Sequence, residues 1–102
     1  MARVAWTLVI REEKIEEYER VHAAVWPTVL KAIKDAGVRN YSIHRHGTRL
    51  FGYFECDDPE VTIPAMKAGQ AAAGWGDAMQ DVVTPEVAAN GVDYMPEIFR
   101  LD

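Results

Sequence analysis

Tyr18, His22 and Trp26 stand four residues apart in the stretch EYERVHAAVWP, which covers residues 17 to 27. Side chains at this spacing share one face of a helix. Histidine is the side chain whose unperturbed pKa lies nearest neutral pH, so His22 could act as a general acid or base in a partly dry pocket. A core histidine satisfied by one hydrogen bond explains the same pattern, and on spacing alone we favour it.

Two other stretches offer side chains to such a pocket. In RNYSIHRH, residues 39 to 46, Tyr41 could meet the helix face across the layer between sheet and helix. In GWGDAM, residues 74 to 79, Trp75 stands between glycines and could form a flat wall for a sugar or another flat ligand. Asp77 could bind hydroxyl groups. A core-filling tryptophan and a solvated aspartate explain the same residues.

Other kinds of site find little support. His44 and His46 could both touch a metal ion, but no third ligand is near in the sequence, so we expect a solvated strand end and no metal. The single cysteine, Cys56, leaves neither an intrachain disulfide nor a thiolate cluster. The chain has no GxGxxG, P-loop or GxSxG motif.

Composition indicates one globular domain over residues 1–102, with 49% hydrophobic and 26% charged residues. The net charge of -5 argues against nucleic acid or an anionic membrane surface as a partner. The chain has no signal-peptide pattern and nothing near the ~20 apolar residues of a membrane span. We therefore expect a soluble, cytoplasmic protein.

The elements that must position these residues follow the order β-α-β-β-α-β, which is the ferredoxin-like arrangement of the α+β class. Apolar residues on both faces of the strands predict a sheet buried on both sides, as a symmetric dimer packed sheet on sheet would provide. The expected elements are a strand over 3–10, a helix over 12–36 that Pro27 kinks or restarts, a hairpin of 38–46 and 49–56, helical pieces over 60–68 and 70–83, a loop over 84–93 and a strand over 94–101.

The stretch EEYERVHAAVWPTVLKAIKDAGVRNYSI resembles the core of the L-rhamnose mutarotase family, and the closing EIFRLD is similar to that family's tail. The resemblance implies a dimeric α+β barrel built from ferredoxin-like protomers. It also implies a cytoplasmic, cofactor-free isomerase that interconverts the α and β anomers of a 6-deoxy sugar, with L-rhamnose first and L-fucose also admissible.

The resemblance also assigns roles by position. His22 would be the catalytic proton donor, and Tyr18 and Tyr41 would bind the sugar. Trp75 matches the first residue of the family's Trp-Trp pair, whereas Gly76 stands where the second would be. Three further positions are candidates for the pocket wall: Trp26, Asn40 and Asp77.

Two rival functions share the expected fold. One is a cofactor-free monooxygenase or haem-handling protein of the dimeric α+β barrels, which would also use histidine and tryptophan near a pocket. The other is a non-catalytic dimeric binding module, in which His22 would carry no proton.

Overall fold

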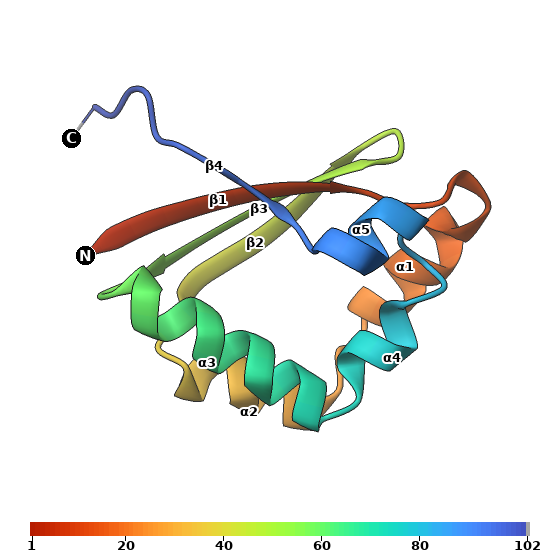
Figure 1. Ribbon diagram of the computed structural model, residues 1–102, viewed down its shortest axis with the longest axis horizontal. Coiled ribbons are helices and arrows are strands. Elements are labelled where there is room, and N and C mark those ends of the chain that lie inside the picture. Colours follow the sequence, from red (N-terminus) through yellow and green to blue (C-terminus); the bar gives the residue numbers. More distant parts are fainter. Residues whose placement is uncertain (102) are drawn as a thin grey trace.

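A four-stranded antiparallel sheet forms one layer of the molecule (Figure 1). The computed structural model describes residues 1–101. The strands lie in the order β2-β3-β1-β4, the sheet order of a ferredoxin-like chain. The predicted α+β class is therefore confirmed. The strands are β1 (Ala2–Val9), β2 (Arg39–His46), β3 (Arg49–Cys56) and β4 (Asp93–Met95).

The helices form the second layer, and Figure 1 shows α2 and α3 side by side below the sheet. Gly69 of α3 allows this pairing, since a Cβ atom there would lie 2.8 Å from the Cβ of Ala32 on α2. A 3-10 turn at Glu12–Lys14 precedes the helices, which are α1 (Ile15–His22), α2 (Pro27–Asp35), α3 (Pro59–Ala72), α4 (Trp75–Met79) and α5 (Pro85–Asn90).

The core lies between the two layers. Alternate residues of β1 and β3 face the helices, as period-two strands require, and they bury Trp6, Leu50 and Phe54. Gly52 pairs with Trp6 across the two strands, and a Cβ atom at this position would lie 2.0 Å from the indole ring. Glycine at position 52 thus leaves the space that Trp6 fills in the core.

The helix expected over 12–36 is two helices, because the chain leaves helical geometry between His22 and Pro27. Pro27 occupies the first turn of α2, where its missing N–H costs nothing and its fixed φ suits the helix. The expected alternative of a restart at Pro27 is confirmed. His22 is consequently the last residue of α1 rather than the middle of a longer helix.

The break expected between residues 68 and 70 is wrong. The helix α3 runs through both Pro64 and Gly69, and it stops where Gly74 adopts a left-handed φ of 80°. The N-terminus of α3 is capped by Asp58, whose side chain accepts a hydrogen bond from the Glu60 N–H. Gly69 stays helical and allows the close packing against α2. The helix ends instead at Gly74, because a glycine can adopt the left-handed conformation that the turn needs.

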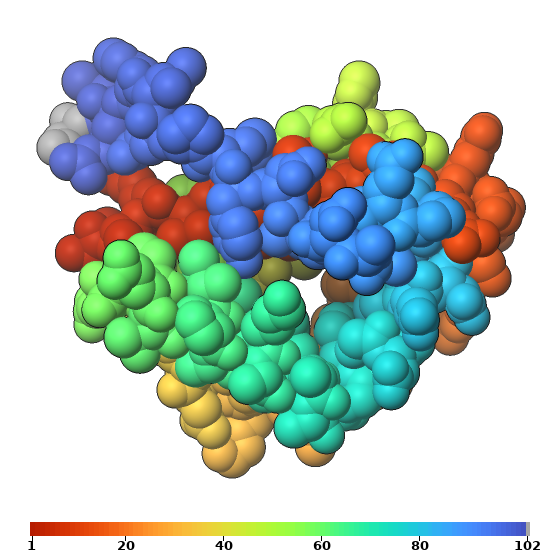
Figure 2. Space-filling model, viewed as in Figure 1, coloured from red at the N-terminus to blue at the C-terminus, as the bar shows by residue number. Residues whose placement is uncertain are grey.

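Two expectations for the C-terminal part are also wrong. The predicted loop over 84–93 contains α5, which Thr84 caps and Pro85 opens. A strand is predicted over 94–101, but the observed strand covers only Asp93–Met95, because Pro96 has no N–H to continue the pairing. Beyond it, Ile98, Phe99 and Leu101 are 94%, 80% and 83% exposed, and Figure 2 shows this end of the chain standing away from the rest of the molecule.

The sheet face turned away from the helices stays open in the single chain. Phe51 and Met95 are each 37% exposed there, and Ala5, Val9 and Tyr53 are half-buried. The expectation of two buried faces therefore depends on a partner. No helix within residues 1–101 is both long and apolar enough to cross a membrane.

Candidate functional site

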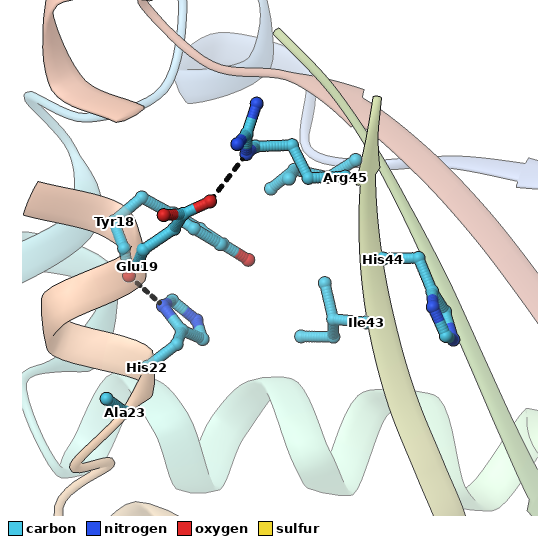
Figure 3. Close-up of a pocket in the computed structure, with 8 residues that line it drawn as sticks. Tyr18, Glu19, His22, Ala23, Ile43, His44 and Arg45 are labelled. Carbon is cyan, nitrogen blue, oxygen red and sulfur yellow. Dashed lines mark hydrogen bonds and ion pairs between the residues drawn. The ribbon is translucent and has the colours of Figure 1, made fainter. Parts of the chain in front are cut away.

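A cavity of about 520 Å³ opens between α1 and the hairpin of β2 and β3. Figure 3 shows Tyr18 and His22 projecting from α1 toward Ile43 on β2. The lining of the cavity combines polar groups with an apolar wall, which suits a small ligand that carries both kinds of surface. The residues that line it are Tyr18, Glu19, His22, Ala23, Ile43, His44, Arg45 and Leu50.

His22 is held by a hydrogen bond of 2.9 Å between its Nδ1 and the backbone oxygen of Tyr18, one turn earlier in α1. A carbonyl oxygen can only accept, so Nδ1 must carry the hydrogen. In the neutral ring, Nε2 then keeps its lone pair. Burial lowers the pKa of His22 below its ordinary 6.5, and the hydrogen bond to Tyr18 offsets part of this effect. At neutral pH, His22 is therefore an uncharged proton acceptor at Nε2.

Aromatic rings fix the orientation of this imidazole. The Tyr18 ring stacks on it with centroids 3.8 Å apart, and the Trp75 ring meets it edge-on at 5.4 Å. Trp26 in turn packs edge-on against Trp75 at 5.1 Å. Trp75 is buried and opens α4, directly after the left-handed turn at Gly74. Three separate segments thus bring Tyr18, His22, Trp26 and Trp75 together.

Tyr41 stands on the sheet side of the same region. Its ring lies 5.4 Å from that of Phe54, and burial raises the pKa of its phenol to about 12. Burial also raises the pKa of Tyr18 above its ordinary 10.0, and the nearby Tyr41 hydroxyl raises it further. Both phenols therefore keep their protons at neutral pH, so each can donate a hydrogen bond to a ligand oxygen.

The cavity lining itself does not include Trp26, Tyr41 or Trp75. The remaining sequence candidates lie apart from this region. Asn40, which has a φ of 51° at the bulge of β2, donates from Nδ2 to Glu55 Oε1 at 2.7 Å. Gly76 and Asp77 line a second hollow of about 380 Å³ beside α5. A Cβ atom at Gly76 would meet nothing within 4 Å, so this glycine borders open space.

Sequence reasoning missed three polar residues near the site. Glu19 and Arg45 line the cavity as an ion pair, and they lie 26 residues apart in the sequence. Tyr94 pairs with Trp6 across β4 and β1, and it lies close enough to Tyr41 to raise the pKa of that phenol. The alternation in RNYSIHRH does place Arg45 on the face of Tyr41, and this was the available signal.

The described residues contain no cluster of side chains suited to binding a metal ion. Across residues 1–101, no three side chains of the histidine, cysteine, aspartate and glutamate types come close enough to hold an ion. His44 Nε2 and the Ser42 hydroxyl instead share a hydrogen bond of 3.2 Å.

Comparison with known proteins gives one consistent result. A family model described as L-rhamnose mutarotase matches residues 3–101. An L-rhamnose mutarotase of Opitutus terrae is 33% identical over 106 residues, and one of Phocaeicola vulgatus is 30% identical over 105 residues, with all of both chains covered in each case. The crystal structure of an L-rhamnose mutarotase from Formosa agariphila has a similar fold, with a TM-score of 0.75, 22% identity and full coverage of both chains.

The lowered pKa of His22 predicts how the site responds to acid. Between pH 6.5 and the lower folded-state value, the unfolded chain binds more protons than the folded one at this residue. The contribution of His22 to the free energy of unfolding is thus complete above about pH 6.5 and is lost as the pH falls through the folded-state pKa. Titration of the His22 ring protons by NMR should give a midpoint below 6.5. A midpoint at or above 6.5 contradicts the burial argument.

Proposed function

The chain belongs to the L-rhamnose mutarotase family, and from this premise we propose that it is an isomerase that interconverts the α and β anomers of L-rhamnose. The observation in the structure that best supports this activity is His22, an imidazole with one nitrogen committed to the backbone and the other available in a cavity. L-Fucose finds no support in the comparisons, and neither do the monooxygenase, haem-handling and binding-module alternatives.

The reaction needs one proton to move from the anomeric hydroxyl to the ring oxygen. In our proposal, Nε2 of neutral His22 takes the proton of the hydroxyl on C1 as general base. The electrons of that O–H bond form the C1 carbonyl while the bond between C1 and the ring oxygen breaks. The imidazolium then donates the proton to the departing ring oxygen, which is the proton-donor role that the resemblance implies for His22.

The open-chain sugar completes the interconversion within the cavity. Rotation about the C1–C2 bond presents the other face of the carbonyl to the hydroxyl on C5, which was the ring oxygen. Proton transfer then runs in reverse through the same nitrogen, so His22 ends as it began, neutral and protonated at Nδ1. The hydrogen bond to Tyr18 keeps Nδ1 out of the reaction throughout, and this leaves a single nitrogen to serve both oxygens.

Tyr18 and Tyr41 are proposed to bind sugar oxygens. Their raised pKa values keep both phenols protonated, so they donate hydrogen bonds without competing for the proton that His22 carries. Tyr18 also stacks on the imidazole. A phenol from the helix and a phenol from the sheet would therefore hold the ring from two sides.

Trp75 is proposed to form the apolar wall against the C–H groups of the sugar, with Trp26 packed edge-on against it. Gly76 brings no side chain, so the wall has one indole rather than two. We assign no sugar contact to Asn40, which is bonded to Glu55, or to Asp77, which faces the second hollow.

Exchange NMR of L-rhamnose tests this proposal. Catalytic amounts of the protein should speed magnetisation transfer between the α and β anomeric protons relative to buffer. Substitution His22→Asn should slow the catalysed exchange by roughly 10²- to 10⁴-fold, since it removes the proton carrier. The matched control is His46→Asn at the exposed end of β2, which should leave the rate unchanged.

The outcomes of this experiment are separable. Absence of any acceleration by the unmodified protein would refute the proposed activity. Full activity in a folded His22→Asn protein would instead refute the role of His22 and leave the activity standing.

We further propose that the protein is a homodimer in which a second copy covers the open face of the sheet. That face presents Phe51 and Met95, and the C-terminal segment adds Ile98, Phe99 and Leu101 with little cover of their own. Apolar surface of this kind marks an interaction site. A cytoplasmic location is proposed from the family resemblance, and the buried free thiol of Cys56 suits a reducing compartment.

Analytical ultracentrifugation tests the dimer. The unmodified protein should sediment with twice its chain mass of 11.5 kDa, whereas Phe51→Glu and Phe99→Glu should shift it toward the single-chain mass by placing a charge in the interface. Leu30→Glu is the matched control, because Leu30 is 49% exposed on α2, in the other layer of the fold. A single-chain mass for the unmodified protein would contradict the proposal.

A further inference from the structure

An ion pair between α1 and β2 lines the same cavity as His22. Arg45 Nε donates to Glu19 Oε1 at 2.7 Å, and Arg45 Nη1 donates to the backbone oxygen of Gly47 at 2.9 Å. Figure 3 shows this pair joined across the space between helix and strand, beside Tyr18. Both of its members are lining residues of the cavity.

The pair has hydrogen-bonding capacity left over. A guanidinium carries five N–H donors, and Arg45 uses two of them in these bonds. Glu19 bonds through Oε1 and keeps Oε2 as a further acceptor. The two side chains are 34% and 56% exposed, so these groups can be reached from solvent. A donor group and an acceptor group therefore stand side by side at the cavity.

Stability does not explain the presence of this ion pair at the cavity, because exposed ion pairs contribute little to the free energy of folding. Binding of a ligand explains it better. Each hydroxyl of a vicinal diol can accept one hydrogen bond and donate another, and a guanidinium beside a carboxylate offers both complements. The bond to Gly47 holds the guanidinium in place before any ligand arrives, which lowers the entropic cost of binding.

We propose that Glu19 and Arg45 form a substrate-binding subsite for the vicinal hydroxyls on C3 and C4 of the pyranose. This inference rests on the proposed function. In a six-membered sugar ring, the C3–C4 bond lies opposite the bond between C1 and the ring oxygen. Anchoring the diol at Glu19 and Arg45 would thus turn the bond that breaks toward His22. The ion pair orients the sugar ring relative to His22, and it takes no part in proton transfer.

The substitutions Glu19→Gln and Arg45→Met test the subsite in the exchange assay. Each removes a charged hydrogen-bonding partner, so each should raise the KM for L-rhamnose about tenfold. The pH dependence of kcat should stay that of the unmodified protein, since His22 is untouched. Circular dichroism should show both variants folded, because the pair is exposed.

The chain supplies a matched control on the same strand. Arg39 of β2 pairs with Asp57 at 3.0 Å, is also exposed, and lies outside the lining of the cavity. Arg39→Met and Asp57→Asn should therefore leave KM unchanged. Changes of similar size in both pairs would mean that the effect is one of general charge, and would overturn the subsite.

A substrate analogue locates the contact on the sugar. For the unmodified protein, the 4-deoxy analogue of L-rhamnose should show a KM about tenfold above that of L-rhamnose, and Arg45→Met should bind the two sugars equally. If Arg45→Met keeps the full preference for L-rhamnose, the hydroxyl on C4 does not meet this pair and the inference fails. If the unmodified protein accelerates no exchange at all, the proposed function fails first.

Discussion

The hydrogen bond between His22 Nδ1 and the Tyr18 backbone oxygen decides what this site can do. It commits one imidazole nitrogen to the protein and leaves the other with its lone pair. Burial adds a second constraint by keeping the imidazole uncharged at neutral pH. A neutral histidine with one free nitrogen can take a proton and return it, and an exchange of anomers requires no more than that from its proton carrier.

The rest of the fold holds this imidazole against its neighbours. The helix α1 ends at His22, and Pro27 starts α2 in a new direction, so Trp26 is carried to the side of Trp75. Gly74 turns the chain so that Trp75 meets the imidazole edge-on. The sheet contributes from the opposite side, through Tyr41 and Arg45 on β2. These side chains come from α1, the residue before α2, α4 and β2, and so the site exists only in the folded chain.

Sequence reasoning was strongest where the relevant physics is local. The four-residue spacing of Tyr18 and His22 predicts a shared helix face because helical geometry requires it, and the alternation in β2 places Tyr41 toward the helices for the same kind of reason. It failed at Gly69 and Gly74, which look alike in the sequence. Only the closeness of Ala32 on α2 reveals that Gly69 serves packing while Gly74 makes the turn. The contact between Glu19 and Arg45 was likewise out of reach, since it depends on how α1 lies beside β2.

The most direct test of this account is the protonation state of the His22 ring at neutral pH. Two-bond correlation of ring protons with ¹⁵N distinguishes a nitrogen that carries hydrogen from one that carries a lone pair. The account predicts a protonated Nδ1 and an unprotonated Nε2, both in the free protein and with L-rhamnose present. A ring protonated at Nε2 alone, or at both nitrogens, would contradict it, because the nitrogen that faces the sugar could then not accept the anomeric proton.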